Sequence, residues 1–188
     1  MNPIKITVDR LREIAPTLKI TDRVLLSGYV YTARDAAHKR FSAMIDRGEP
    51  LPFPVFGAVI YYAGPTDTPP GAVIGSCGPT TSGRMDAFTP ALLDMGLAAT
   101  IGKGQRSPAV VEALKRNKAV YFCALGGAGA LAARCVKSCE TVAFDDLGCE
   151  SVKKIFFDDF PLFVAADSSG NDIFTSGREK YRNVFVQN

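Results

Sequence analysis

The stretch LAATIGKGQRSPAVVEALKRNKAVYFCALGG, residues 97–127, decides the fold class of the chain. It begins as a short apolar strand, passes through a glycine-rich loop into a helix, and ends in a second strand with aromatic and β-branched residues. Ser107 and Pro108 are typical of a helix N-cap and of the first helical position. Strands and helices that alternate over short loops predict an α/β fold, with a parallel or mixed sheet covered by helices.

The same alternation extends in both directions from this stretch. It predicts further strands and helices on each side, with additional strands at both ends of the sheet. The expected strands cover residues 23–33, 57–65, 71–79 and 140–148, the expected helices cover residues 34–48, 84–96 and 128–138, and residues 151–174 are expected to form a hairpin closed by SSGND.

Composition narrows the possible partners. The 188 residues are 47% hydrophobic, which predicts one globular domain over residues 1–188. A net charge of +3, from 22 basic and 19 acidic residues, is too even to indicate nucleic acid and leaves small anions as ligands. No apolar run is long enough to predict a membrane-spanning segment. The N-terminus is charged where a signal peptide has an apolar stretch. We expect a cytoplasmic protein without a membrane partner.

The cysteines do not predict a metal site held by this chain alone. Neither a CxxC motif nor a second histidine besides His38 is present, so we expect small buried thiols in a reducing compartment. The five cysteines are Cys77, Cys123, Cys135, Cys139 and Cys149.

The first candidate ligand site is TARDAAHKR, residues 32–40, where a strand ends and a helix begins. Ligands of α/β sheets gather at such junctions, because the free N–H groups of the helix attract anions. Arg34 would repel the positive end of the helix unless an anion lies there, while Asp35 either caps the helix or pairs with Arg34. The alternative is a solvated basic helix face.

The second candidate is GPTTSGRMD, residues 78–86. Thr80, Thr81 and Ser82 offer hydroxyl donors, and Arg84 can hold a carboxylate through two parallel hydrogen bonds. An ordinary N-cap needs only one hydroxyl, so the combination favours capture of an anion.

The third candidate is GKGQRSP, residues 102–108, in which Lys103 lies between two glycines that let the backbone bend sharply. The alternative is a surface turn with an incidental lysine. If the three loops converge, Arg34, Arg84 and Lys103 form a pocket for a small, doubly charged anion.

A competing signal is the pattern Gly127-x-Gly129-x-x-Ala132, which follows a strand and precedes a helix. With Asp145 further along, it matches the spacing of a dinucleotide fingerprint. Close packing of a helix on a strand, or a second carboxylate-binding turn, explains the same glycines.

The three loops carry a resemblance to a known family. TARDAAHKR, GPTTSGRMD and IGKG, in this order and at these separations, resemble the C-terminal domain of class I, iron–sulfur-dependent fumarate hydratases. They are equally similar to the β subunit of two-subunit fumarate and tartrate dehydratases. The likeness continues through GGAGALAA, AFDDLGCESV and DFPLFVAADSSGND and covers about residues 21–174. It implies a swivelling β/β/α domain, whose barrel-like mixed sheet is flanked by helices.

The resemblance also implies a set of site residues. The basic residues of this set would hold the two carboxylates of the substrate, and Thr80 matches a residue proposed to move the proton at carbon 3. His38 and Asp35 are possible further members. The positions that match the family's substrate-binding residues are Arg34, Thr80, Thr81, Arg84 and Lys103.

Finally, the resemblance implies a cofactor and a partner. The family's 4Fe–4S cluster is held by three cysteines of another domain, which this chain lacks, and Cys77 is not expected to join them. We therefore expect a β subunit that interconverts fumarate and L-malate only with an α subunit, in an α2β2 assembly. An L(+)-tartrate dehydratase β subunit is one alternative, and a non-catalytic module that binds a dicarboxylate or a dinucleotide is another.

Overall fold

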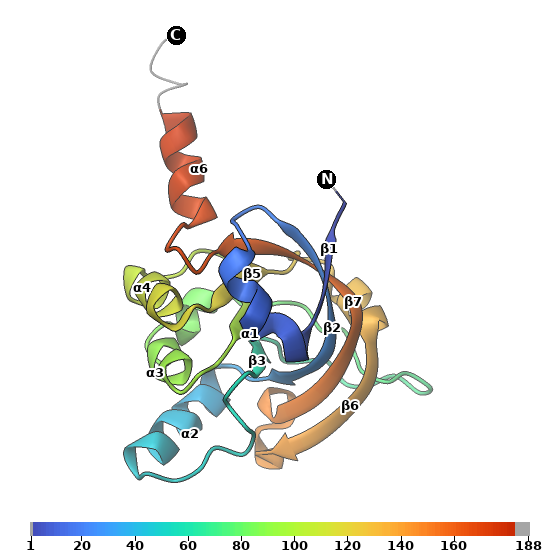
Figure 1. Ribbon diagram of the computed structural model, residues 1–188. Coiled ribbons are helices and arrows are strands. Elements are labelled where there is room, and N and C mark those ends of the chain that lie inside the picture. Colours follow the sequence, from blue (N-terminus) through green and yellow to red (C-terminus); the bar gives the residue numbers. More distant parts are fainter. Residues whose placement is uncertain (1, 183–188) are drawn as a thin grey trace.

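The computed structural model describes residues 2–182 and has a closed, five-stranded mixed sheet at its centre (Figure 1). Four of the strands run parallel to one another, and the fifth runs antiparallel and pairs with both the first and the fourth. This second pairing closes the sheet into a barrel. In order around the barrel, the strands are β2 (Arg23–Thr32), β3 (Val59–Tyr61), β4 (Ala99–Gly102), β5 (Val120–Cys123) and β7 (Val152–Ala166).

Two further strands extend the sheet outside the barrel. Strand β1 (Ile4–Thr7) pairs in parallel with β2, and β6 (Val136–Ala143) pairs antiparallel with β7. Strand β2 bends at a bulge between Leu26 and Gly28, where Gly28 has φ +125°. Glycine adopts that conformation without steric cost, so the bulge lets β2 curve around the barrel.

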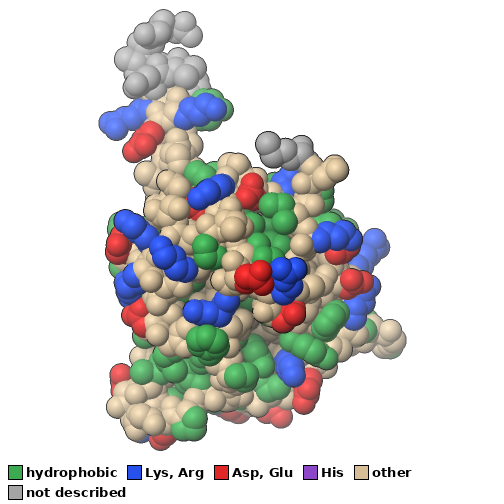
Figure 2. Space-filling view, viewed as in Figure 1, with side chains coloured by type: hydrophobic (Ala, Val, Ile, Leu, Met, Phe, Trp, Pro, Cys, Tyr) green, Lys and Arg blue, Asp and Glu red, His purple; other side chains and the backbone are tan. Residues whose placement is uncertain are grey.

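Helices α2, α3 and α4 cover one side of the barrel, whereas α6 projects away from it (Figure 1). The α-helices are α1 (Leu11–Ile14), α2 (Asp35–Asp46), α3 (Thr89–Asp94), α4 (Pro108–Asn117), α5 (Gly129–Cys135) and α6 (Ile173–Arg182), and the 3-10 segments are η1 (Val8–Arg10), η2 (Ala15–Thr17), η3 (Ser82–Met85) and η4 (Asp145–Glu150). None of the helices between residues 2 and 182 is long and apolar enough to cross a membrane. On the face shown in Figure 2, basic and acidic side chains are interspersed.

Two apolar cores share the barrel strands. Tyr61 belongs to one core together with Phe157, whereas its neighbours Ile60 and Tyr62 belong to the core that contains the helix residue Phe41. Successive residues of a strand point to opposite faces, so each barrel strand is covered on both sides. This double burial explains why the strands read as nearly continuous apolar runs.

The structure confirms the α/β class and the barrel-like mixed sheet with flanking helices. The helix expected in the opening stretch is also confirmed, because α4 begins at Pro108 and the Ser107 hydroxyl accepts a hydrogen bond from Val110 N–H at 3.4 Å. The helices expected at residues 84–96 and 128–138 are both shorter than predicted.

The strand expected at residues 71–79 is wrong. Strand β3, which precedes this segment in the chain, already has β2 and β4 as neighbours, so this segment cannot pair with it. The backbone N–H groups of this segment donate to acceptors outside the sheet. Ser76 N–H donates to Thr66 Oγ1 at 2.9 Å, and Cys77 N–H donates to Gly129 O at 3.0 Å.

The hairpin expected at residues 151–174 forms only at its turn, where Ala166 and Asp172 make an isolated antiparallel bridge, and the returning strand is wrong. Strand β7 runs unbroken to Ala166, and the Asp167 carboxylate then accepts hydrogen bonds from Ser169 N–H and Asn171 N–H, which closes a turn. Asp172 follows and accepts a hydrogen bond from Phe174 N–H at 3.0 Å. The turn therefore leads into α6 and not into a returning strand.

Candidate anion-binding site

The loops that follow three neighbouring strands meet at one edge of the barrel. Strands β2, β3 and β4 are parallel, so their carboxyl ends share an edge, and Arg34 and Lys103 lie just beyond two of these ends. The loop of residues 78–86 reaches the same edge through two backbone hydrogen bonds. Thr80 N–H donates to Tyr62 O at 2.6 Å, and Thr80 O accepts from Lys103 N–H at 3.1 Å. The three predicted loops thus come together.

Thr81 and Lys103 lie side by side on this edge. They form an isolated parallel β-bridge, and Ser82 N–H donates to Lys103 O at 2.8 Å. Glycine is required at position 102, because a Cβ there would lie 2.0 Å from Ser82 Oγ. Thr81 and Lys103 are both exposed, so a hydroxyl and an ammonium group are accessible from solvent on adjacent backbone segments.

Two predicted arginines from distant motifs share one carboxylate. Asp35, the first residue of α2, accepts a hydrogen bond from Arg84 Nε at 2.7 Å, and its other oxygen lies 3.8 Å from Arg34 Nε. No residue between 2 and 182 accepts a hydrogen bond from the two terminal nitrogens of Arg84. Because Asp35 holds the Nε side, the Nη1–Nη2 edge of Arg84 is free to bind a carboxylate through two parallel bonds.

The charges of this arginine pair are largely balanced by the chain itself. Besides Asp35, Glu150 lies close, with its Oε1 at 3.5 Å from Arg34 Nη2. Two guanidinium groups therefore face two carboxylates, and Lys103 adds a further positive charge at the same edge. A dianionic ligand would meet a net charge of about +1, and not the +3 that the sequence pattern suggests.

His38 lies beneath the site and supports the backbone of Arg34. Its Nδ1 lies 2.8 Å from Arg34 O, a carbonyl that only accepts, so Nδ1 carries the proton. Burial lowers the pKa of His38 to about 4, which leaves the ring neutral at pH 7. The rings of Phe41 and Tyr62 pack edge-on at 5.6 and 5.4 Å. His38 therefore supports the entrance of α2 through the backbone carbonyl of Arg34.

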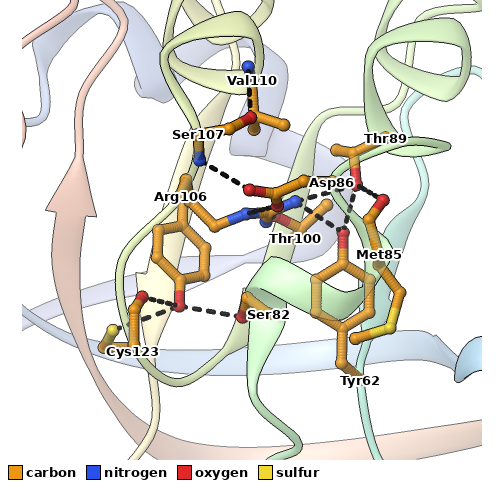
Figure 3. A network of polar contacts seen from close by, with 12 residues as sticks. Tyr62, Ser82, Met85, Asp86, Thr89, Thr100, Arg106, Ser107, Val110 and Cys123 are labelled. Atoms are coloured by element: carbon orange, nitrogen blue, oxygen red, sulfur yellow. Dashed lines mark hydrogen bonds and ion pairs between the residues drawn. The ribbon is translucent and has the colours of Figure 1, made fainter.

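A buried arginine ties the second and third loops together (Figure 3). Arg106 donates from Nε to Asp86 Oδ1 at 2.7 Å, from Nη1 to Thr100 Oγ1 at 3.0 Å and from Nη2 to Thr89 Oγ1 at 2.8 Å. The other oxygen of Asp86 accepts from Ser107 N–H at 2.6 Å. Asp86 ends the loop of residues 78–86, so this pair fixes that loop against the one carrying Lys103.

Tyr121 completes this buried network. Its hydroxyl donates to Gly104 O at 2.8 Å and lies 2.9 Å from Ser82 Oγ, which links both loops to β5. The Arg106 guanidinium lies 4.9 Å from the centre of the Tyr121 ring, a cation–π contact. Burial raises the pKa of Tyr121, so the phenol stays protonated and available as a donor.

The sequence analysis missed Arg106, Asp86 and Tyr121 as members of the site's framework. Asp86 and Arg106 stand inside the two motifs that the analysis quoted, each at the end of a glycine-rich loop. These two residues have opposite charges, and their loops were expected to converge. This combination was the available signal for an ion pair between the loops. Tyr121 gave no signal, because it reads as an ordinary aromatic residue of a buried strand.

The glycine fingerprint of residues 127–132 serves packing. A Cβ at Gly129 would lie 2.4 Å from Ser76 Oγ and 3.0 Å from Gly78 N, so the loop before Thr80 approaches α5 closely. The next strand, β6, pairs antiparallel with β7, whereas a dinucleotide unit needs a second parallel strand. The geometry favours the packing explanation, and Asp145 simply begins η4.

The cysteines are not arranged to hold an iron–sulfur cluster. Cys77 is buried, and this burial raises the pKa of its thiol to about 12. Throughout the described part of the chain, from position 2 to position 182, no three His, Cys, Asp or Glu side chains gather as metal ligands. These residues do not fit a 4Fe–4S cluster.

Comparison with known proteins gives consistent matches. A family model described as "Fumarase C-terminus" matches residues 1–177. "Fumarate hydratase 2" of Leishmania major is 40% identical over 174 residues, which cover 92% of this chain and 31% of that protein. "Fumarate hydratase class I, aerobic" of Escherichia coli is 38% identical over 177 residues, which cover 91% of this chain and 32% of that protein.

A shorter relative matches almost end to end. "Putative L(+)-tartrate dehydratase subunit beta" of Methanocaldococcus jannaschii is 38% identical over 169 residues, which cover 87% of each chain. The chain thus spans about a third of the length of the two fumarate hydratases but most of the length of this protein.

Proposed function

The chain belongs to the fumarase C-terminus family, and from this membership we propose that it is the β subunit of an iron–sulfur-dependent hydro-lyase that interconverts fumarate and L-malate. The observation that carries the proposal is the convergence of two arginines on one carboxylate at the edge that also presents Thr80, Thr81 and Lys103. Charged donors at one sheet edge suit a small dicarboxylate.

In the proposed reaction, the basic residues bind the two carboxylates of the substrate. The free Nη edge of Arg84 grips one carboxylate in two-point fashion, and Arg34 and Lys103 supply further positive charge. Adding water across fumarate passes through an aci-carboxylate with additional negative charge. Fixed cations directed at that charge stabilise the transition state more than the ground state.

We assign the proton transfer at carbon 3 to Thr80. A threonine alcohol is a weak base near neutral pH, so its anion must be strongly stabilised by its surroundings. Lys103 is a cationic residue on the neighbouring backbone segment, where its N–H donates to Thr80 O at 3.1 Å. Thr81, which is exposed beside Lys103, is proposed to donate its hydroxyl to the substrate.

We propose that an α subunit carries the 4Fe–4S cluster, because the cysteines of this chain do not fit that group. The near-balanced charge of the arginine pair supports the same division of labour, since a site with little net charge binds a dianion weakly without further donors. The almost complete mutual coverage with a protein named as a β subunit also favours a two-subunit enzyme, for which we propose two copies of each subunit.

A second candidate is the β subunit of an L(+)-tartrate dehydratase. A relative whose match covers 87% of both chains carries that name, whereas the fumarate hydratase of Leishmania major is about three times longer than this chain. Fumarate, malate and tartrate are all four-carbon dicarboxylates, so the same basic residues suit each of them. These substrates differ in their number of hydroxyl groups, so the partner subunit and the loops must discriminate between them by that number.

Co-expression with a candidate α subunit that has three cluster-ligand cysteines tests the proposal. After anaerobic purification, we expect the pair to act on fumarate and L-malate, and the chain alone to remain inactive even after reconstitution with iron and sulfide. Assays on both tartrate enantiomers distinguish the second candidate. Full activity of the chain alone would refute the division of labour, and inactivity of every pair would favour a binding module.

A further inference from the structure

Glu150 makes two contacts at the entrance of α2, one with the helix backbone and one with the Arg34 side chain. Its Oε2 accepts a hydrogen bond from Ala36 N–H at 3.0 Å, and its Oε1 lies 3.5 Å from Arg34 Nη2. Ala36 carries one of the N–H groups that the first turn of a helix leaves without an internal partner. The same carboxylate thus fixes the start of α2 and one side of the Arg34 guanidinium relative to each other.

Arg34 needs such a partner because its own position is unfavourable. It is the N-cap residue of α2, it makes no side-chain hydrogen bond to the helix, and its positive charge lies next to the positive end of the helix. A Cβ at Gly64 would lie 3.0 Å from Arg34 Nη1 and 3.2 Å from Cys149 O, so the backbone at Gly64 is close both to Arg34 and to the residue before Glu150. The guanidinium therefore has two close neighbours, the backbone at Gly64 and the carboxylate of Glu150.

The segment that carries Glu150 is itself anchored to α2. Arg40 donates from Nη1 to Asp146 Oδ1 at 2.8 Å, and its guanidinium lies 4.9 Å from the centre of the Phe144 ring. Gly148, with φ +57° and ψ −116°, turns the chain so that Glu150 faces the helix. Two anchor points along α2 make the position of Glu150 well defined.

We propose that Glu150 is a positioning residue, which holds the Arg34 guanidinium in the orientation that binds a substrate carboxylate. This inference rests on the proposed function, in which Arg34 contacts the dicarboxylate. Two simpler roles make different predictions. A helix cap alone would leave Arg34 unaffected, and a mere negative charge would weaken the binding of every anion, so its removal would strengthen binding.

Glu150→Gln separates these roles in the full chain. The amide oxygen of the new side chain still accepts from Ala36 N–H, but the ion pair with Arg34 is lost. The readout is solvent exchange of the Arg34 Nε–H proton by NMR, assigned through its disappearance in Arg34→Lys. Nε of Arg34 is buried without a partner among the described residues, so this exchange is expected to be slow in the wild type.

We expect Glu150→Gln to speed this exchange at least about tenfold, while the backbone N–H of Phe41 in α2 exchanges as before. Glu140→Gln is the matched control, because it removes the same charge from an exposed position on β6. Unchanged exchange at Arg34 in Glu150→Gln would overturn the proposal.

The second measurement is the affinity for L-malate, for the chain and for the pair with its α subunit. We expect affinity to fall about tenfold in Glu150→Gln and in Gly64→Ala, whose added Cβ would crowd Arg34 Nη1 at 3.0 Å without removing the Glu150 carboxylate. Equal or tighter binding in Glu150→Gln would overturn the proposal. If the wild type binds no L-malate in either form, the proposed function fails, and the exchange rates alone still decide whether Glu150 positions Arg34.

Discussion

Arg106 and Arg84 make the same bond in opposite surroundings. Both come from the converging glycine-rich loops, and each donates from Nε to an aspartate at 2.7 Å. The Arg106 side chain is 1% exposed and its terminal nitrogens donate to threonine hydroxyls, whereas the Arg84 side chain is 51% exposed and its terminal nitrogens have no acceptor among residues 2–182. Arg106 uses its donors to hold the loops together, whereas Arg84 keeps two terminal nitrogens that can donate to a ligand.

The difference shows what an ion pair does in each place. Removing one partner of a buried pair leaves a charge without solvation, which is costly, whereas an exposed pair contributes little to stability. Mutations should therefore separate the two arginines by the property that each one affects, folding for Arg106 and ligand binding for Arg84.

The largest effect is expected at Arg106. Arg106→Leu leaves the Asp86 carboxylate, 14% exposed, without its partner, so we expect the free energy of unfolding to fall by about 3–5 kcal/mol. Urea denaturation measures this loss. The control, Arg84→Leu, should change the free energy of unfolding by less than about 0.5 kcal/mol, and equal losses would remove the distinction between the two arginines.

The next effect extends the comparison to His38, a basic side chain that is buried like Arg106 but neutral. Its pKa of about 4 lies below the unfolded value near 6.5, so the unfolded state binds more protons between these pH values. Stability from this residue is complete above about pH 6.5 and is lost as pH falls towards 4, by about 3 kcal/mol in total.

The chain has one histidine, so its ring signals can be followed without overlap by NMR. We expect a midpoint near pH 4 and a weaker dependence of stability on pH in His38→Asn. A midpoint near 6.5 would mean that the ring is accessible to solvent, against the burial described above.

A third effect should appear in activity and not in stability. Arg84→Lys keeps the positive charge but cannot grip a carboxylate at two points, so we expect kcat/KM of the reconstituted pair to fall about 10- to 100-fold. Arg116→Lys is the matched control, because Arg116 also donates from Nε to an aspartate, Asp94, and its side chain is 45% exposed. Equal activities of the two variants would remove Arg84 from the site.

The smallest effect is expected from that same surface pair. Asp94→Asn breaks an exposed ion pair with no ligand nearby in the proposal, so the free energy of unfolding should change by less than about 1 kcal/mol. Thermal or urea unfolding provides the measurement. A loss as large as that of Arg106→Leu would mean that burial does not separate the two classes of arginine.

Much of the framework could be predicted from the sequence, because its signals are local. The α/β class follows from alternating periodicities, and α4 follows from Ser107 and Pro108 at its start. The convergence of the loops follows from the rule that parallel strands end at the same edge. The apolar pattern of residues 71–79 was misleading, because a sequence pattern does not reveal whether a sheet edge is available.

The remaining features depend on partners that are distant along the chain. Arg106 and Arg84 both lie in glycine-containing loops, and packing distinguishes them, because Tyr121 and Tyr62 lie against the buried Arg106 guanidinium. Glu150 meets Ala36 across a separation of 114 residues. Such pairs arise from the closure of the barrel, and no local periodicity encodes them.

Closure by β7 also has a consequence for how the protein emerges from the ribosome. Strands β2 and β5 each have one edge that pairs with β7, the last strand to be synthesised among those described. Until β7 has been synthesised, these two edges are unpaired. Open edges of this kind invite pairing with other chains. The edges of β2 and β5 stay unpaired until residues 152–166 have been synthesised, and chaperone capture before that point would protect the nascent protein from misassociation.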